Sequence, residues 1–356
     1  MVQLFNGGPD RGGGDDRPQH GRYESCLEEA GFRIETINPN QSPWNLGPRH
    51  HNAFRGLDPL RALRVLLLRR DAAIICAHAE SALIVLLLRR LFRLRARVVV
   101  WELQWSASWR FRVIVNRLAI RRADCSVVFG SNQIELARER FDPGAPLVCI
   151  PFCIDLDFFR AQACPDETPS EIFSCGFDDG RDFPLLLEAC HGLGLPVLIK
   201  TGGKLPLDPV GHATVRQNFE RLSYPDFRRL YARARIVVVT THATENASGV
   251  TALMEAMAMG RPTIVTDNPA LRDYFAPPDA LRIVPVGDAA ALRAAILDLW
   301  RHPEEAEAMG RRARAFAERH FHPRLHFQRV ADLYKSLLPP PSAGVARPRG
   351  ALENPG

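Results

Sequence analysis

Long apolar runs are missing from this sequence of 356 residues. The longest uninterrupted one, Ala82 to Leu88, ends at Arg89 and falls well short of the ~20 apolar residues that a helix needs to cross a bilayer. The first residues lead into a glycine-rich stretch, Gly7 to Gly14, and not into a basic segment followed by an apolar one. We therefore expect no membrane-spanning helix and no secretory signal peptide, and we predict a cytoplasmic protein.

The spacings typical of metal sites and disulfide frameworks are also missing. The eight cysteines form no C-x-x-C pair and have no histidines at zinc-ligand spacing. Several of them lie in apolar, strand-like runs, as Cys76 and Cys149 do. Because cysteine often behaves as a small core hydrophobe, we interpret the eight as buried free thiols and predict no metal site.

Lysine is scarce, since only three of the 46 basic residues are lysines. The first half carries the whole net charge of +6, and between Arg61 and Arg122 there are 14 arginines against three acidic residues. A GC-rich genome favours arginine over lysine but does not confine the excess to one segment. We therefore predict a basic face for an anionic membrane surface, a phosphorylated acceptor or nucleic acid. Nucleic acid ranks last, because no zinc finger or aromatic RNP signature accompanies the arginines.

The length and the composition, 46% hydrophobic and 24% charged, predict a globular chain of about two domains. Short β-branched runs alternate with longer amphipathic ones, as parallel strands alternate with helices, so the predicted class is α/β. In the first half we expect strands at 2–5, 32–37, 72–77, 97–101, 126–129 and 147–150, and helices at 23–30, 58–70, 81–93, 109–121 and 132–140. In the second half we expect strands at 172–175, 197–200, 214–218, 236–240, 263–266 and 281–284, and helices at 184–193, 225–233, 250–259, 289–300, 303–319 and 323–337.

Residues 151–170 show no clear period and contain Pro165 and Pro169, so we place the domain junction there. Two doubly wound domains that face each other leave a cleft between the carboxyl ends of their strands, where ligands of such sheets bind. The predicted organisation is a first Rossmann-like domain at 1–160, a second at 161–322, a helix at 323–338 that packs back on the first domain, and a disordered tail at 339–356.

The most informative segment runs from Thr244 to Thr266. Ser248 and Gly249 open a predicted helix, whose free N–H groups and positive dipole end form a site for an anion. Glu255 lies about two turns further along, near the face of Ser248, where a carboxylate can accept both hydroxyls of a ribose. A solvated surface glutamate is the alternative, but the apolar residues that follow Glu255 are untypical of an exposed helix.

The run Glu-Ala-Met-Ala-Met-Gly-Arg-Pro, residues 255–262, resembles the donor-binding stretch of the retaining GT-B glycosyltransferases of family 4, also called group 1. The resemblance covers most of the second half and agrees more loosely with the first. It implies two Rossmann-like domains across a cleft, a nucleotide-diphosphate sugar as substrate, no cofactor, and retention of anomeric configuration. It also implies that Glu255 binds the donor ribose. The residues that would cradle the diphosphate are Ser248, Gly249, Val250 and Thr251.

The family places a second glutamate where this sequence has Ala247, and the nearest acidic residue is Glu245. Either a two-residue insertion keeps Glu245 near the sugar as a catalytic residue, or Ser248 and backbone groups have replaced it.

A second patch, residues 175–183, follows the first predicted strand of the second domain, where the family places an arginine and a lysine for the donor phosphates. Phe177 occupies the place of that arginine, so Arg181 is the candidate, since a guanidinium donates two parallel hydrogen bonds to a diphosphate. A surface pair with Asp182 is the alternative for Arg181. Lys200 is a further donor-binding candidate, whereas we interpret Lys204 as a loop charge.

In the first domain, Gly7 and Gly8 fit a turn that faces the acceptor side of the cleft. Glu102 ends a predicted strand, and its carboxylate is a candidate for orienting or deprotonating the acceptor hydroxyl. A salt bridge or a helix cap is an equal alternative for Glu102. His78 ends the neighbouring strand on the same rim and is a further acceptor-side candidate.

These residues together predict a hexosyltransferase that moves a sugar from a nucleotide-diphosphate donor to a glycan or lipid-linked acceptor, with retention and without a metal, in cell-envelope glycan or glycolipid synthesis. Arg181 and the helix start would stabilise the leaving diphosphate. The basic helices would hold the enzyme against an anionic membrane surface. The alternatives are a degenerate GT-B module that binds a nucleotide sugar without turnover, and a sugar-nucleotide epimerase.

Overall fold

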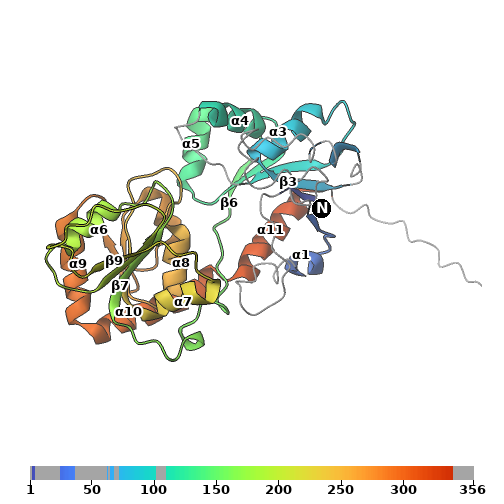
Figure 1. The fold of residues 1–356 in the computed structure, drawn as a ribbon. Helices are drawn as coiled ribbons and strands as arrows, with labels where there is room; N and C mark the ends of the chain where they lie inside the picture. The colour runs from blue at the N-terminus through green and yellow to red at the C-terminus, as the bar shows by residue number, and fades with distance from the viewer. Residues whose placement is uncertain are drawn as a thin grey trace, which may run out of the picture.

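The computed structural model describes residues 2–4, 25–36, 62, 65–67, 72–101 and 110–339, and the fold is given for these residues. They form two lobes, each built on a parallel sheet with helices on both faces (Figure 1). The predicted α/β class with two doubly wound units is confirmed.

The first sheet has the strand order β2-β1-β3-β4-β5-β6. Its strands are β1 (Val2–Leu4), β2 (Glu35–Thr36), β3 (Ile74–His78), β4 (Arg97–Trp101), β5 (Cys125–Val128) and β6 (Leu147–Cys149). Side chains alternate between its faces, so that Ile75 and Ala77 join one apolar core and Ile74 and Cys76 join the other. The part of this lobe that the structure describes contains the helices α1 (Ser25–Glu29), α3 (Ala79–Leu88), α4 (Arg110–Ile120) and α5 (Asn132–Phe141), and residues 62 and 65–67 are also helical.

The last helix of the chain, α11 (Pro323–Leu337), packs on the first sheet although it follows the second in sequence (Figure 1). Its buried residues Val330, Ala331 and Tyr334 share a core with Ile74 and Cys76. The thiol of Cys76 donates a hydrogen bond to the Tyr334 hydroxyl at 3.0 Å. The chain therefore crosses between the lobes twice, once after β6 and once before α11.

The second sheet has the order β12-β11-β10-β7-β8-β9, with all its pairings parallel. Its strands are β7 (Glu171–Gly176), β8 (Val197–Thr201), β9 (Val215–Asn218), β10 (Ala234–Val239), β11 (Thr263–Thr266) and β12 (Arg282–Val284). One face carries α6 (Phe183–Cys190) and α9 (Ala289–Arg301), and the other carries α7 (Tyr224–Arg233), α8 (Val250–Ala258) and α10 (Pro303–His320). Strands covered on both faces are near-continuous apolar runs, as β10 is.

Side-chain caps start three helices of the second lobe. Asp182, Ser223 and Asp288 accept hydrogen bonds from the backbone N–H groups of Leu185, Asp226 and Ala291, respectively. These caps satisfy N–H groups that have no partner within their own helix. α8 differs, because its N-cap residue is Gly249, which has no side chain to offer.

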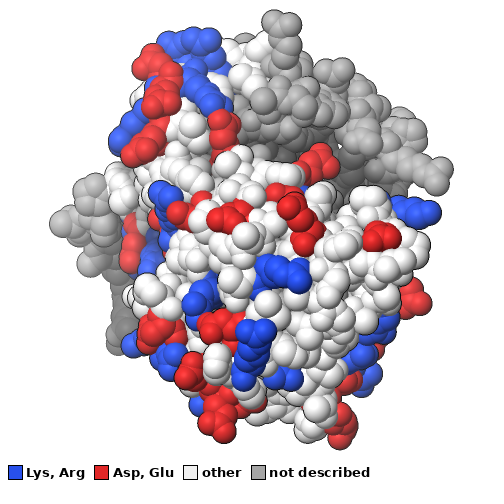
Figure 2. Space-filling model, turned by 90° about the vertical axis from the view of Figure 1, so that its left-hand side faces the viewer, with Lys and Arg blue, Asp and Glu red and all other residues white. Residues whose placement is uncertain are grey.

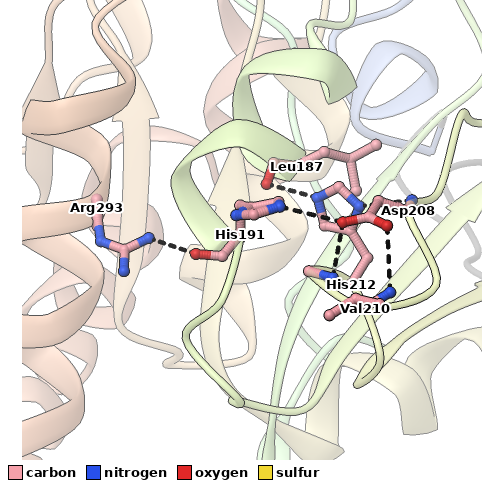
Figure 3. A network of polar contacts seen from close by, with 7 residues as sticks. Leu187, His191, Asp208, Val210, His212 and Arg293 are labelled. Carbon is pink, nitrogen blue, oxygen red and sulfur yellow. Dashed lines mark hydrogen bonds and ion pairs between the residues drawn. The ribbon is translucent and has the colours of Figure 1, made fainter.

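The loop between β8 and β9 is held to the end of α6 by a polar network (Figure 3). The Asp208 carboxylate accepts hydrogen bonds from the backbone N–H groups of Gly211 and Val210, and it lies 3.2 Å from Nε2 of His191. These contacts lower the pKa of Asp208, the backbone N–H groups most of all. The His212 ring bridges Asp208 to the backbone of Leu187, so the network fixes loop geometry.

Most predicted elements coincide with observed ones to within a few residues. The predicted strand 32–37 is observed only as β2, and the predicted helix 81–93 is observed as α3, which ends at Leu88. Most of the predicted helix 58–70, and the tail from residue 340 onward, lie outside the described residues.

All eight cysteines are free, five of them buried and three half-buried. Burial raises the pKa of the Cys76 and Cys175 thiols to about 12, which keeps them protonated and unreactive at neutral pH. Within the part of the chain that the structure describes, no group of histidine, cysteine and acidic residues has the arrangement of a metal site. No helix among the same residues has the length and apolar character needed to cross a membrane.

Candidate functional site

A cavity of about 690 Å³ lies between the two lobes. The first lobe contributes Phe129 and Gln133, and the connection after β6 contributes Phe152. The second lobe contributes the rest of the lining, from two loops: residues 177–180 after β7, and residues 244 and 246–251 before and at the start of α8. Both loops follow carboxyl ends of strands, which is where ligands of such sheets bind.

Gly249 turns the chain into α8 in a conformation that other residues rarely adopt. Its φ is +81°, in the left-handed region that favours glycine. A Cβ on Gly249 would also stand 2.6 Å from Nη1 of Arg181 and 2.9 Å from Cγ1 of Val239. The open start of α8 therefore needs glycine both for its backbone conformation and for its contact with the arginine.

Arg181 lies behind this turn and is only 5% exposed. Its side chain passes so close to Gly176 that a Cβ there would stand 2.6 Å from Cγ of Arg181. None of its three guanidinium nitrogens has a hydrogen-bond partner among the described residues. Burial lowers the pKa of this guanidinium, because a charged group is disfavoured away from water.

The alternative of a surface pair between Arg181 and Asp182 is wrong. Asp182 caps α6 through Oδ1, and its Oδ2 lies 3.3 Å from Nδ1 of His242. The buried guanidinium instead lies beside the first turn of α8. A buried cation that has no hydrogen-bond partner among the described residues, next to a helix start without a side-chain cap, is an arrangement that favours an anion.

The loop at 177–180 is fitted against the start of α8. The Ser248 hydroxyl donates a hydrogen bond to Oδ1 of Asp178, and the same oxygen accepts one from the Gly180 N–H at 3.0 Å. A Cβ on Gly180 would stand 2.6 Å from Oγ of Ser248. Asp178 and Gly180 thus hold Ser248 in place at the wall of the cavity.

Glu255 lies on α8 behind that wall and is not among the residues that line the cavity. It is half-buried, and its Oε2 accepts a hydrogen bond of 2.6 Å from the Tyr231 hydroxyl. Burial raises the pKa of the Glu255 carboxyl to about 7, and the bond from Tyr231 opposes that rise. The solvated-surface alternative for Glu255 is therefore wrong.

Tyr231 was not singled out from the sequence. It comes from α7, is fully buried, and its hydroxyl also lies 3.1 Å from Sγ of Cys175. The only local signal is an aromatic residue on the apolar face of a helix, which is far more often plain core. Its contact with Glu255 depends on how α7 and α8 pack on one face of the sheet.

Lys200, another predicted donor-binding residue, does not itself line the cavity. Lys200, at the end of β8, is 4% exposed, and its Nζ donates to the backbone oxygen of Asn218 at 3.4 Å. Its Nζ lies 5.2 Å from the ring centre of Phe177, which is 67% exposed. Lys200 is thus behind Phe177, the residue at the position where the resemblance places an arginine.

Glu245 connects the two lobes. Its carboxylate pairs with the Arg140 guanidinium of α5, Nη1 to Oε2 at 2.6 Å and Nη2 to Oε1. Its backbone oxygen accepts a hydrogen bond from Nδ2 of Asn132 at 3.1 Å. Glu245 is not among the residues lining the cavity, whereas Ala247, the position of the family's glutamate, is. The catalytic role of Glu245 stays a prediction.

Of the acceptor-side candidates, only His78 is described. It is half-buried at the carboxyl end of β3, on the edge of the first sheet that faces the cleft. Gly7, Gly8 and Glu102 lie outside the described residues.

Residues 197–332 match the profile of a family described as glycosyl transferase-like. The D-rhamnosyltransferase WbpZ of Pseudomonas aeruginosa is 30% identical over 137 residues, which are 37% of this chain and 36% of that protein. This similarity thus spans little more than a third of either protein. The matched family segment contains the start of α8, Glu255 and Tyr231, but it begins after Arg181.

Solved structures resemble most of the chain in fold. A sucrose-phosphate synthase from Thermosynechococcus elongatus superposes with a TM-score of 0.74 at 17% identity, covering 94% of this chain and 98% of that one. HepE of Anabaena, in complex with UDP, superposes with a TM-score of 0.64 at 14% identity, covering 94% and 99%. The chain therefore has the predicted GT-B fold, and its residues 197–332 are similar to the glycosyl transferase-like family.

Proposed function

We propose that this protein is a glycosyltransferase that moves a sugar from a nucleotide-diphosphate donor to an acceptor hydroxyl. The observation that carries the proposal is the guanidinium of Arg181, buried without a hydrogen-bond partner among the described residues and in contact with Gly249 at the uncapped start of α8. Arg181 does not itself line the cavity, but its guanidinium and the positive end of the α8 dipole meet directly behind the cavity wall, and together they favour a diphosphate there.

The similarities to known proteins support this proposal independently of the site geometry. The matched glycosyl transferase-like segment contains α8, the related WbpZ is named a D-rhamnosyltransferase, and HepE of the same fold binds UDP. The chemistry at the start of α8 agrees with these names, since the leaving group of a nucleotide sugar is a diphosphate.

In this mechanism Arg181 and the N–H groups of α8 stabilise the charge that develops on the leaving diphosphate, without a metal. Glu255 binds the ribose once its carboxylate exchanges the Tyr231 hydroxyl for those of the sugar. The family resemblance supports retention of configuration. The acceptor, a glycan or a lipid-linked sugar, enters from the first lobe, where the candidates are His78, Glu102, Gly7 and Gly8.

We place the enzyme in the cytoplasm against an anionic membrane surface, in the synthesis of cell-envelope glycan or glycolipid. The support is the distribution of charge. The first half of the sequence carries the whole net charge of +6, whereas acidic and basic side chains are interspersed on the face of the second lobe in Figure 2. A surface with one sign of charge attracts anionic lipids, and a mixed one does not.

A binding module without turnover is the second candidate, and two observations favour it. The Glu245 carboxylate is engaged by Arg140, and Phe177 stands exposed where the resemblance places an arginine. Such a module would bind the nucleotide sugar and release no sugar.

A thermal-shift panel of UDP, GDP, ADP and their common sugar conjugates tests the proposal on the wild type, Arg181→Ala and the control Arg311→Ala. Arg311 is exposed on α10, and its ion pair with Glu307 is long, at 3.9 Å. One nucleotide should stabilise the wild type and the control but not Arg181→Ala. Sugar transfer from a conjugate of that nucleotide supports the glycosyltransferase. Binding without transfer supports the module without turnover, and the absence of any nucleotide binding refutes both proposals.

A further inference from the structure

A second cavity, of about 650 Å³, opens between the C-terminal ends of α3 and α4 in the first lobe. Five arginines and three leucines line it, and we refer to it as the arginine cleft. They are Arg89, Arg90, Arg117, Arg121, Arg122, Leu86, Leu87 and Leu118.

The arginine cleft is separate from the cleft between the lobes. α3 follows β3 and ends before β4, and α4 ends before β5. In a parallel sheet, helices that follow strands end at the amino edge, whereas the interdomain cavity lies at the carboxyl edge. The arginines therefore do not contact the proposed donor.

The positive charge of the arginine cleft is only partly balanced. Asp124 accepts hydrogen bonds from Arg89 at 2.9 Å and Arg97 at 3.1 Å, and its side chain is mostly buried. Asp142 lies 3.5 Å from Arg121 and is largely exposed. Three of the lining arginines have no acidic partner among the described residues: Arg90, Arg117 and Arg122.

Arginines near helix C-termini also interact favourably with the helix dipole, and this interaction alone would explain the presence of one or two arginines at the ends of α3 and α4. Five guanidinium groups around one cavity repel one another, and the dipole offsets this only in part. A ligand with several anionic oxygens removes the repulsion, and the guanidinium fork matches phosphate in geometry. The cavity volume is also in the range of small-ligand sites.

We propose that the arginine cleft is a binding site for phosphate groups, separate from the donor site. Exposed leucines beside it favour phospholipid headgroups over free phosphate compounds as the source. Leu87, which lines the cleft, is 52% exposed, and Leu91, which follows Arg90, is 77% exposed. Arginines that bind headgroups next to leucines that enter the acyl boundary form a typical interfacial surface. The inference deepens the membrane part of the proposed function, on which it rests, but requires no sugar transfer.

The test compares the wild type with Arg90→Glu/Arg117→Glu in co-sedimentation with vesicles of phosphatidylglycerol and phosphatidylcholine. Among the residues that the structure describes, neither arginine has an acidic partner to lose, so the fold should persist. The control is Arg311→Glu/Arg319→Glu on α10, which changes the net charge equally but lies on the second lobe. We expect at least about tenfold weaker vesicle binding for the cleft variant and little change for the control.

Three outcomes overturn the inference in different ways. Equal vesicle binding by the cleft variant and the wild type, together with equal binding of inorganic pyrophosphate, refutes the site. Pyrophosphate binding that is lost in the cleft variant, with no vesicle binding by the wild type, refutes the lipid source. A short DNA duplex that displaces the vesicles at equal phosphate concentration assigns the cleft to nucleic acid. The nucleotide thermal shift, measured on the same proteins, reports on the proposed function independently.

Discussion

Gly249 and Arg181 are in direct contact across the start of α8, since a Cβ on the glycine would stand 2.6 Å from Nη1 of the arginine. The contact joins two segments that are separate in sequence, the loop after β7 and the loop after β10. It brings a side-chain charge to a helix terminus without a capping side chain between them.

Gly249→Ala should abolish nucleotide binding and destabilise the fold. The new methyl group meets Arg181 and Val239, and alanine is strained at a φ of +81°, so we expect a loss of about 1–3 kcal/mol in the free energy of unfolding. Urea unfolding and the nucleotide thermal shift measure the two effects. The matched control is Gly203→Ala, where a Cβ meets nothing within 4 Å. A normal nucleotide response in Gly249→Ala would refute the role assigned to this turn.

Arg181→Met should make the nucleotide-free protein more stable while removing nucleotide binding. The side chains are similar in length, and the substitution removes a buried charge that has no hydrogen-bond partner among the described residues. Replacing a poorly compensated buried charge by an apolar side chain stabilises proteins by about 1–4 kcal/mol. Urea unfolding without nucleotide gives the first quantity and a thermal shift with nucleotide gives the second. A less stable variant that still binds nucleotide would contradict both parts.

Local patterns in the sequence predicted the elements that place the site. Strand β10 and helix α8 are recognisable because apolar runs of different period are separated by Ser248 and Gly249. The helix start beside the cleft follows from that local order alone. The short β2 was predicted too long, because an edge strand is limited by the pairing partner it finds and not by its own composition.

Contacts between distant positions could not be predicted in the same way. The bond from Tyr231 to Glu255 joins residues 24 positions apart on two helices, and that from Arg140 to Glu245 joins residues 105 positions apart in different lobes. Their geometry depends on helix packing and on the orientation of the lobes. Sequence spacing therefore singled out Glu255 and Glu245 as candidates, but it could not predict the partners with which they form hydrogen bonds.

Glu255 should make stability depend on pH between about 4.5 and about 7. Its carboxyl pKa is raised from 4.5 to about 7, so in this window the folded state holds a proton that the unfolded state has released. Stability then falls as pH rises through the window, by up to about 3 kcal/mol in total. The Glu255→Gln variant has no carboxyl group that titrates at this position, so its free energy of unfolding lacks this pH dependence. The variant should therefore gain stability relative to the wild type as pH rises from 4 to 8. Urea unfolding at several pH values checks this, and parallel curves for the two proteins would refute the raised pKa.

The same carboxyl group should control nucleotide binding. If its ionised form accepts the ribose hydroxyls, nucleotide affinity rises with pH through about 7 in the wild type and is low and flat in Glu255→Gln. Tyr231→Phe removes the competing donor to Oε2 and should retain the pH dependence with an altered midpoint. Calorimetric titration with the stabilising nucleotide measures the affinity. Equal affinity in the wild type and Glu255→Gln across this range would exclude the ribose-binding role.

The pair between Arg140 and Glu245 distinguishes a catalytic glutamate from a connection between the lobes. Both side chains are about two-fifths exposed, so the pair alone contributes at most about 1 kcal/mol to stability. If the pair only connects the lobes, Glu245→Gln and Arg140→Gln should each lower kcat by a similar factor of less than about tenfold. The double variant should then have the same kcat as either single variant. A catalytic Glu245 predicts the opposite pattern: a kcat reduced by 100-fold or more in Glu245→Gln, with Arg140→Gln close to the wild type. Single-turnover transfer rates on the four proteins decide between the two, and the stability of each variant, measured alongside, separates a weakened fold from a lost chemical group.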